Sequence, residues 1–250
     1  MTLQPKSFAY PGQELGLFAD ALNWKRYWAS KVTPFLGPHV AEIGAGIGAN
    51  AAMLSWHAIR WTCIEPDSNQ AGQIAARRAR GDLPPSCEVV TGSLSDLDDT
   101  ARFDTVLYLD VLEHIADDRA EVAMAARHLR PGGHLVVLGP AHPWLFSSFD
   151  AAIGHHRRYT RRSLAKLAPP GLEPVVSAYL DMAGILASLA NRLLLRNANP
   201  TPAQIGLWDR HLVPISTRLD KITGFRLGKS ILAIWRKPVG AEPHNLHATG

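Results

Sequence analysis

The sequence predicts an α/β fold with a doubly wound, mostly parallel sheet of seven strands, helices on both faces and a helical insertion before the last strand. The first observation is the alternation of short apolar runs with helical patterns between residues 39 and 138. Parallel strands need crossover connections, which are usually helices, so this alternation is typical of a parallel sheet. The apolar runs are also nearly continuous, as expected of strands buried on both faces. Hydrophobic residues make up 46% of the 250 residues and charged residues 19%, which indicates a globular chain with a sizeable core.

The predicted elements follow in order along the chain. An amphipathic helix over 13–30, with apolar side chains at helical spacing, forms an N-terminal helical cap over 1–36. A core over 37–180 follows, in which the first strands are expected over 39–43, 61–64, 87–90, 103–109 and 134–138. Helices are expected between these strands over 49–56, 69–80 and 117–129. The last of these helices is stopped by Pro131-Gly132-Gly133.

Beyond Pro140 the alternation breaks. A loop rich in histidine, arginine and aromatic residues leads to a helix that begins near Thr160, and a sixth strand is expected over 173–179. Two helical pieces, 182–196 and 205–222, form an insertion over 181–224 that we interpret as a lid. The final strand lies over 229–235, within a segment 225–237, and a flexible tail over 238–250 ends the chain.

Charge and cysteine content restrict the class of protein. The net charge is only +4, and the basic residues form no array that would track a nucleic-acid groove. Cys63 and Cys87 lack metal-ligand spacing and predict no disulfide framework, which fits a reducing cytoplasm. The N-terminus has no signal-peptide pattern, and no stretch approaches the ~20 apolar residues that span a bilayer. We expect a soluble or peripheral cytoplasmic protein, as a monomer or homodimer.

A glycine-rich turn is the strongest functional motif. The run from Glu42 to Gly48 follows a predicted strand and opens a helix, with the spacing E-x-G-x-G-x-G rather than the G-x-G-x-x-G of dinucleotide sites. The carboxylate of Glu42 suits a cationic ligand better than a diphosphate. One strand–helix–strand unit later, Glu65 ends the next strand, where a carboxylate can accept both hydroxyls of a ribose. Alone, Glu65 could be a solvated residue at a strand end, but together the two motifs favour a ligand site.

These motifs belong to a longer resemblance. The chain resembles class I (Rossmann-like) S-adenosylmethionine-dependent methyltransferases, in particular a broad group with an "LEH" motif after the fourth strand. The resemblance runs from about His39 to Tyr159, and more loosely to Trp235. Its matching pieces are VAEIGAGIGA, CIEPD, TGSLSDL, FDTVLYLDVLEHIADD and LRPGGHLVVLGPA. It implies a methyltransferase with S-adenosyl-L-methionine as cofactor and S-adenosyl-L-homocysteine as product.

The resemblance also implies the residues of the cofactor site. The implied contacts are Glu42, Gly44, Ala45 and Gly46 at the methionine part, Glu65 and Pro66 at the ribose, Gly92, Ser93 and Leu94 around the adenine, and Asp110 and Val111 beside the cofactor. Many relatives carry asparagine or another small polar residue where this chain has Asp110. Glu113 of the LEH motif is expected to be structural rather than catalytic.

Methyl transfer from a sulfonium needs an aligned nucleophile, excluded water and, for an alcohol or phenol, a base. Histidine suits the base because its ordinary pKa is close to neutral. The candidates are His114, which could equally pack beside the cofactor, His142 after the fifth strand, and His155 in the run Gly154 to Tyr159. That run matches a G-H-x-R-R-Y pattern of a methyltransferase subgroup, which implies that the loop faces the active site. The sequence leaves the choice of base open.

Substrate recognition is assigned to the same loop, through Trp144, His156, Arg157, Arg158 and Tyr159. The arginines could bind a carboxylate or phosphate, or form an ordinary basic surface. Tyr159 could stack on substrate or pack in the core. The insertion could be a lid over an apolar acceptor, a contact with an anionic membrane or lipid-linked substrate, or a surface packed on the sheet or a dimer partner. No compact metal-ligand cluster is visible, so no metal is expected, although a site made of scattered histidine and aspartate residues stays open.

The sequence therefore predicts a methyltransferase for a small or amphipathic acceptor, with O-methylation favoured over N- or C-methylation. A natural-product intermediate or a lipid-linked sugar would fit. A nucleic-acid substrate is not expected, because Leu109 to Leu112 replace the [DNS]-P-P-[FYW] motif of amino-methylating enzymes. A nicotinamide-dependent oxidoreductase is disfavoured by the glycine spacing. Two alternatives stay open: a cofactor-binding enzyme of other chemistry, such as a cyclase or decarboxylase, and a non-catalytic cofactor-binding partner protein.

Overall fold

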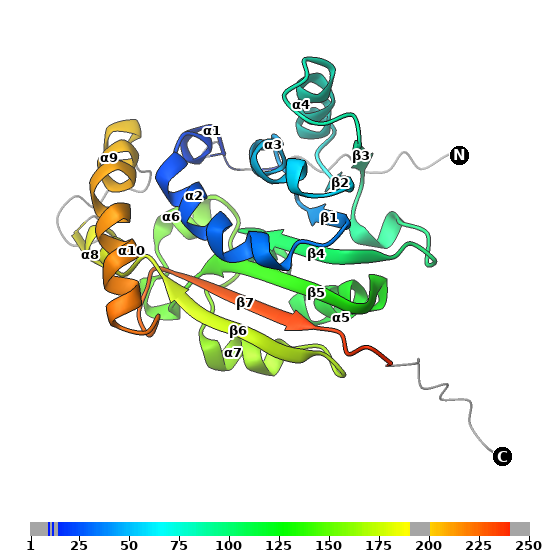
Figure 1. Cartoon of the computed structure of the whole chain (residues 1–250). Helices are drawn as coiled ribbons and strands as arrows, with labels where there is room; N and C mark the ends of the chain where they lie inside the picture. Colours follow the sequence, from blue (N-terminus) through cyan, green and yellow to red (C-terminus); the bar gives the residue numbers. More distant parts are fainter. Residues whose placement is uncertain (1–9, 11, 13–14, 191–200, 241–250) are drawn as a thin grey trace, which may run out of the picture.

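A computed structural model describes residues 10, 12, 15–190 and 201–240 of the chain. Its centre is one seven-stranded sheet with the strand order β3-β2-β1-β4-β5-β7-β6 (Figure 1). The strands are β1 (His39–Ile43), β2 (Arg60–Glu65), β3 (Cys87–Thr91), β4 (Phe103–Leu109), β5 (Leu129–Pro140), β6 (Glu173–Leu180) and β7 (Ser230–Arg236). Neighbouring strands pair in parallel except β7, which runs antiparallel to both β5 and β6. The predicted fold class is confirmed.

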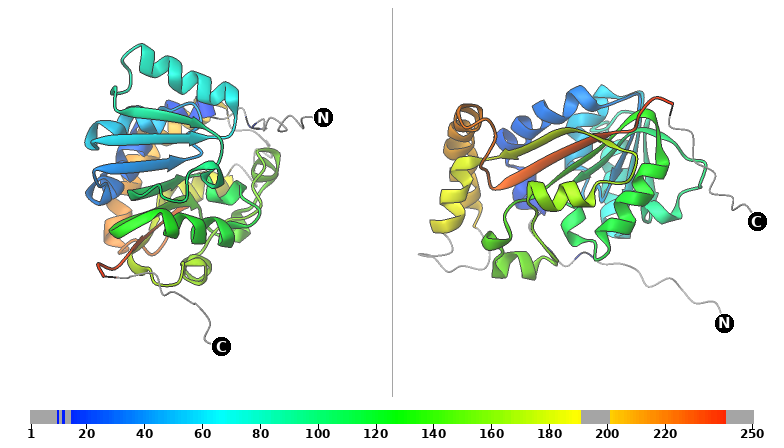
Figure 2. Two further views of the ribbon diagram at one scale, coloured as in Figure 1. Left: turned by 90° about the vertical axis from the view of Figure 1, so that its right-hand side faces the viewer. Right: turned by 90° about the horizontal axis from the view of Figure 1, so that it is seen from below.

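Helices lie on both faces of this sheet (Figure 2). They are α1 (Leu15–Ala19), α2 (Leu22–Val32), α3 (Ala49–Leu54), α4 (Ser68–Ala79), α5 (Asp118–His128), α6 (Ser148–Ala152), α7 (Arg161–Leu167), α8 (Met182–Ala190), α9 (Pro202–Leu207) and α10 (Val213–Ile222). Short 3-10 turns cover Thr33–Phe35, Ser55–His57, Leu94–Asp96, Leu112–His114 and Pro143–Leu145, and a π-helical turn covers Trp208–Leu212. No helix in the described part of the chain is long and apolar enough to cross a membrane.

Two hydrophobic cores sandwich the sheet because successive strand residues point to opposite faces. In β4, Leu107 joins the core under α2 and α3, whereas its neighbour Tyr108 joins the core under α5 and α7. Trp61 of β2 is fully buried against the first of these helix layers. Cys63 and Cys87 are buried free thiols on adjacent strands, with their sulfur atoms 3.7 Å apart.

The helical insertion lies at the edge of the sheet where the parallel strands end. It follows β6, which runs in the same direction as β5, so α8, α9 and α10 gather beyond the carboxyl ends of the strands (Figure 1). Asp181 fastens it: its carboxylate accepts hydrogen bonds from Ser216 Oγ at 2.6 Å and Trp208 Nε1 at 2.8 Å. Asp209 in turn accepts from the backbone N–H of Trp24 at 2.8 Å, which joins the insertion to α2.

Three elements differ from the sequence prediction. Within the described residues, the helix expected over 13–30 is two helices, because the buried Ala21 leaves helical geometry with ψ of 67°. The piece expected over 205–222 is interrupted by the π-helical turn just before Pro214, whose missing N–H prevents a continuous hydrogen-bond ladder. Strand β5 begins at Leu129 instead of His134, since Gly132 and Gly133 pair with the backbone of Lys237. Positions 191–196 of the expected lid helix lie outside the described residues.

Candidate cofactor and acceptor site

The glycine-rich turn after β1 has a conformation that only small residues allow. Gly44 has φ of +62°, and a Cβ atom there would lie 2.7 Å from Cγ1 of Val111. Gly46 has φ of +57°, in the same left-handed region. The N–H of Gly44 donates to the carbonyl of Ile64 at 2.8 Å, and the N–H of Gly46 donates to Glu65 Oε2 at 2.7 Å. The end of β2 therefore fixes the shape of the turn.

Glu65 binds backbone with both carboxylate oxygens. Oε2 accepts from Gly46, and Oε1 accepts from the N–H of Asp67 at 2.8 Å. Burial raises the pKa of Glu65, and these N–H donors oppose the rise. Each carboxylate oxygen offers two acceptor sites, so Glu65 retains capacity for the hydroxyls of a ribose.

A pair of opposite charges lies beside the turn. Glu42 is buried; its Oε2 accepts from Trp61 Nε1 at 3.0 Å, and Oε1 has no hydrogen-bond partner among the described residues. Burial raises the pKa of Glu42 to about 7. Lys25 of α2 donates to Asn50 Oδ1 at 2.6 Å, and burial lowers its pKa while the charge of Glu42 opposes this. The carboxylate of Glu42 and the ammonium of Lys25 thus lie beside the same turn. Such a pair fits a ligand that carries both an ammonium and a carboxylate, as the methionine part of S-adenosylmethionine does.

The residues expected around the adenine follow β3. The N–H of Gly92 donates to the carbonyl of Glu65 at 3.0 Å, which holds this segment against the end of β2. Ser93 and Asp96 form a reciprocal cap of the 3-10 turn, and the side chain of Leu94 is buried. A Cβ at Gly92 would lie 2.8 Å from Asp96 Oδ2, so the tight turn requires glycine.

A cavity of about 1020 Å³ extends from the glycine-rich turn to the helical insertion. The sequence-predicted residues that line it are Gly44, Ala45, Gly46, Asp110, His114, His155 and Arg158. Those that do not line it are Glu42, Glu65, Pro66, Gly92, Ser93, Leu94, Val111, His142, Trp144, His156, Arg157 and Tyr159. Tyr10 and Leu15 from the N-terminal segment also line the cavity, and the ring of Tyr10 packs edge-on against His114.

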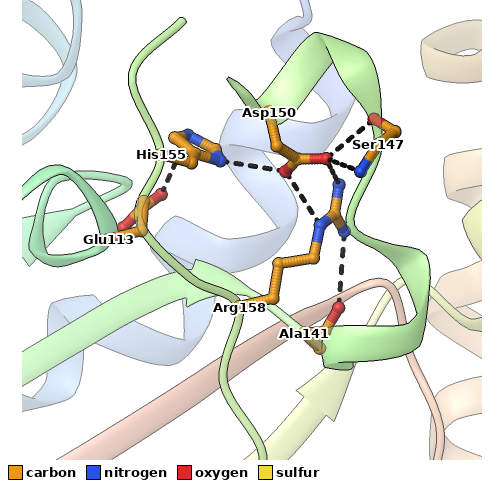
Figure 3. A network of polar contacts seen from close by, with 6 residues as sticks. All are labelled: Glu113, Ala141, Ser147, Asp150, His155 and Arg158. Carbon is orange, nitrogen blue, oxygen red and sulfur yellow. Dashed lines mark hydrogen bonds and ion pairs between the residues drawn. The ribbon is translucent and has the colours of Figure 1, made fainter. Parts of the chain in front are cut away.

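A buried carboxylate that the sequence analysis missed organises one wall of this cavity. Asp150 accepts from both Nε and Nη2 of Arg158, at 2.8 and 2.9 Å, and its Oδ1 lies 2.9 Å from Nδ1 of His155 (Figure 3). Burial alone would raise the pKa of Asp150, but the bonds from His155 and Arg158 outweigh it and hold that pKa well below its usual range. The spacing Ser147-x-x-Asp150 is typical of a capping box, and the two residues do form this cap at the start of α6. This spacing could have identified Asp150 in the sequence.

Two further groups adjoin this pair. Glu113 is buried, and neither of its carboxylate oxygens has a hydrogen-bond partner among the described residues; His155 Nε2 lies 3.7 Å from Oε1. Burial and then the charge of Asp110 raise the pKa of Glu113. The ring of His114 packs edge-on against His155 with centroids 4.5 Å apart. Burial lowers the pKa of His114 to about 4, opposed by a hydrogen bond with the Gly154 backbone.

The remaining residues of the predicted loop turn away from the cavity. His142, at φ of +63°, stacks on Tyr179 with ring centroids 4.7 Å apart. Arg157 pairs with Asp118 at 2.6 Å, and the buried Tyr159 donates to the same carboxylate at 3.0 Å. The side chains of His156 and Trp144 are exposed. The G-H-H-R-R-Y run therefore alternates: His155 and Arg158 reach the cavity, whereas Arg157 and Tyr159 hold the start of α5.

Two charged groups complete the cavity. Asp110, at φ of +57°, exposes its side chain to it, although desolvation by the surrounding protein raises the pKa of its carboxyl. Lys229, which precedes β7, was not predicted. Its Nζ lies 4.0 Å from the ring centroid of Trp208 and 3.7 Å from Asp181 Oδ2, and burial lowers its pKa.

Comparison with known proteins finds relatives in sequence and in fold. Residues 41–135 match a family model described as a methyltransferase domain. The demethylmenaquinone methyltransferase of Tropheryma whipplei (strain Twist) is 28% identical over 151 residues, which cover 60% of this chain and 60% of that protein. The ubiquinone biosynthesis O-methyltransferase of Bradyrhizobium sp. (strain ORS 278) is 26% identical over 117 residues, 47% of this chain and 45% of that one. The chain thus spans less than two thirds of the length of these relatives.

The solved structures show the fold. The N-methyltransferase NodS of Bradyrhizobium japonicum WM9, in complex with S-adenosyl-L-homocysteine, superposes with a TM-score of 0.57 at 15% identity, and the match covers 88% of each chain. The family model and both relatives carry the names of methyltransferases, which is the predicted enzyme class. Residues 41–135 of the chain are thus similar to a methyltransferase domain, and the chain shares the fold of the N-methyltransferase NodS.

Proposed function

We propose that the protein transfers the methyl group of S-adenosylmethionine to a hydroxyl group of a small, amphipathic acceptor. The observation that carries this proposal is the cavity of about 1020 Å³, which joins the glycine-rich turn to the wall formed by Glu113, His114 and His155. A donor held at the turn and an acceptor held at the wall would share one cavity. O-methylation is also named for the Bradyrhizobium relative. We also propose that the chain belongs to the methyltransferase group with an LEH motif after the fourth strand and a G-H-x-R-R-Y loop.

In this proposal the cofactor lies along the ends of β1 and β2. When bound, S-adenosylmethionine supplies an electrophilic methyl group, and S-adenosyl-L-homocysteine leaves as the product. The backbone of Gly44, Ala45 and Gly46 faces the methionine part, whose ammonium pairs with Glu42 and whose carboxylate pairs with Lys25. The buried Glu65 accepts from the ribose. The other proposed neighbours of the cofactor are Pro66, Gly92, Ser93, Leu94, Asp110 and Val111.

The acceptor occupies the part of the cavity toward the insertion. Phe146, Phe149 and Trp208 give this part an apolar lining, which fits the amphipathic character of the acceptor. Arg157 pairs with Asp118 at 2.6 Å and Arg158 with Asp150 at 2.8 Å, whereas Lys229 contacts Asp181 only at 3.7 Å. We therefore assign Lys229 to an acidic substituent of the acceptor. A natural-product intermediate or a lipid-linked sugar fits this description.

Exposed apolar residues of the insertion are evidence for a lid over the acceptor and for a contact with lipid. Leu186 and Leu207 both line the cavity and remain 69% and 61% exposed, so they form an apolar rim. We propose that the insertion over 181–224 closes over the acceptor, and that the rim makes a peripheral contact with a membrane. We further propose that the protein is cytoplasmic, is a monomer or homodimer, and has no nucleic-acid partner.

Activation of the acceptor hydroxyl takes place at the wall. Among the three predicted histidines, His155 has the geometry for this task, because Asp150 fixes its Nδ1 and leaves Nε2 directed toward Glu113. His114 adjoins it. His142 stacks on Tyr179, so its predicted catalytic role has no support from the cavity lining.

Calorimetric titration with S-adenosylmethionine and S-adenosylhomocysteine tests the proposal, with NADH as the control ligand. We expect both sulfur nucleosides to bind and NADH not to bind. The Glu65→Ala variant should lose binding, because it removes the ribose acceptor and the anchor of Gly46. Failure of both nucleosides to bind would reject the proposal. Binding without methyl transfer to any hydroxylated acceptor would instead favour cyclase, decarboxylase or non-catalytic roles.

A further inference from the structure

We propose that Glu113, His114 and His155 form a binding site for a divalent transition-metal ion, with Zn²⁺ as the best match. One metal-ligating atom from each residue lies within 4.8 Å of the others. Ligands of Zn²⁺ stand about 2.0–2.2 Å from the ion, so the three side chains need to close by about 1 Å around it. Binding of the ion is independent of the proposed function; its role in activating the acceptor rests on that function.

Glu113 is the observation that points to a cation. Its carboxyl is fully buried, lines the cavity, and has no hydrogen-bond partner among the described residues. A buried carboxylate without a partner is costly unless a positive charge or donor satisfies it. Arg158 does not serve, because its guanidinium is bound to Asp150, and His155 Nε2 lies 3.7 Å from Glu113 Oε1, too far for a hydrogen bond. Asp110 adds a second negative group to the same cavity, so a cation is the missing partner.

Both histidines have the outer contacts that metal-bound imidazoles usually make. His155 holds Asp150 through Nδ1, which leaves Nε2 for an ion and gives the order carboxylate, imidazole, metal. The ring of His114 is hydrogen-bonded to the backbone of Gly154. Such contacts set the tautomer and orientation of the ring, so the remaining nitrogen is available as a ligand.

The backbone brings the ligands together before any ion binds. Glu113 and His114 lie on the 3-10 turn Leu112–His114 after β4, and His155 follows α6. The N–H of His156 donates to the carbonyl of Glu113 at 2.8 Å, which joins the two segments directly at the site. About 40 residues separate His114 from His155 in the sequence, and the fold makes them adjacent. For this reason the sequence shows no metal-ligand spacing.

The ligand set selects the kind of ion. Two imidazoles and one carboxylate are one of the ligand sets of catalytic zinc sites, which keep one position open for water or substrate, and the same set also binds Fe²⁺. Mg²⁺ and Ca²⁺ prefer oxygen ligands and are not expected here. All three residues line the cavity, so the open position faces the acceptor. With the ion bound, His155 Nε2 is a ligand and not the base that takes the proton. An acceptor hydroxyl at the open position would have a lowered pKa and lose its proton to water more readily.

Metal binding to tag-free protein stripped with a chelator tests this site. We expect one equivalent of Zn²⁺ by calorimetry, and visible absorption bands when Co²⁺ replaces it. Glu113→Gln, which preserves side-chain shape, and His155→Gln should each abolish both signals. Asp150→Asn keeps the ligands and should weaken binding about 10–100-fold. His57→Ala, at an exposed histidine on another 3-10 turn, is the matched control and should bind as the wild type does.

The outcomes separate this inference from the proposed function. No binding of either ion, or equal binding by wild type, Glu113→Gln and His155→Gln, overturns the metal site. Titration of the same samples with S-adenosylmethionine shows whether the variants remain folded and whether the cofactor proposal stands. Cofactor binding without ion binding rejects the metal site alone, and the reverse result rejects the cofactor proposal alone.

Discussion

The Nδ1 atom of His155 lies 2.9 Å from Oδ1 of Asp150, a fully buried carboxylate that also binds two nitrogens of Arg158. Asp150 therefore determines the orientation of the imidazole at the cavity wall. Its position depends on the short helix α6, whose first turn it caps together with Ser147. A change at Asp150 should reach the acceptor through His155 and should leave the glycine-rich turn intact.

The Asp150→Asn variant tests this positioning role. We expect kcat for methyl transfer to fall about 10–100-fold, as for other carboxylates that orient a functional histidine, while KM for S-adenosylmethionine changes little. The buried Arg158 also loses its charge partner, so the free energy of unfolding should fall by about 3 kcal/mol or more. Steady-state kinetics and urea denaturation measure the two effects. Asp118→Asn, which affects the Arg157 pair outside the cavity, should retain kcat; equal losses in both variants would contradict the prediction.

Gly44→Ala tests the glycine-rich turn. The variant places a Cβ at φ of +62° and 2.7 Å from Val111, so the turn must shift. We expect a loss of at least about 1 kcal/mol in the free energy of unfolding, from the left-handed backbone alone, and a large loss of cofactor affinity. Gly72→Ala in helix α4 has no atom within 4 Å of the new Cβ. It should stabilise the protein by about 0.5–1 kcal/mol and bind cofactor normally, and unchanged binding by Gly44→Ala would refute the assigned role.

Glu42 predicts a pH dependence of stability. Burial raises its pKa to about 7 in the folded state, against 4.5 as the ordinary value. Between these values the folded state binds more protons than the unfolded state, so its contribution to the free energy of unfolding decreases as pH rises. The full decrease is at most about 3 kcal/mol, and it is complete above pH 7. Glutamine at position 42 cannot ionise, so the free energy of unfolding of Glu42→Gln should not show this decrease.

Urea denaturation without cofactor, at pH 5 and at pH 8, measures the effect as a difference between wild type and Glu42→Gln. The variant should gain stability relative to wild type at pH 8. Glu88→Gln, at an exposed residue paired with Arg60, is the control and should follow the wild type. Parallel curves for wild type and Glu42→Gln would show that Glu42 does not titrate in this range.

Asp181→Ala tests how the insertion is attached. The variant leaves Trp208 Nε1, Ser216 Oγ and the N–H of Gly184 without their acceptor in a buried site. Each unsatisfied group costs about 1–3 kcal/mol, so the free energy of unfolding should fall by at least about 3 kcal/mol. Thermal denaturation checks this. Asp98→Ala, at an exposed carboxylate that accepts from the nearby Thr100, should lower stability far less than Asp181→Ala. An equally small effect at Asp181 would disprove the attachment.

The sequence by itself determined the sheet and the glycine-rich turn. Strands β1 and β4 begin and end at the predicted residues, because an apolar run bounded by turn residues has one stable place in a buried parallel sheet. The Glu42 to Gly48 run predicted the turn for a related reason. Positive φ at Gly44 and Gly46 is a local property of glycine, so it can be seen in the sequence.

Only the tertiary structure decided which histidine reaches the cavity. His142 and His155 occur in one loop and looked equivalent in the sequence, yet His142 stacks on Tyr179 of β6 and His155 contacts Asp150. The roles of Lys25 and Lys229 were likewise invisible, since they depend on Glu42 and Asp181, which are distant from them in the chain. The physical reason is that side-chain contacts across the fold arise from packing between distant segments, whereas strands and glycine turns follow from local conformational preference.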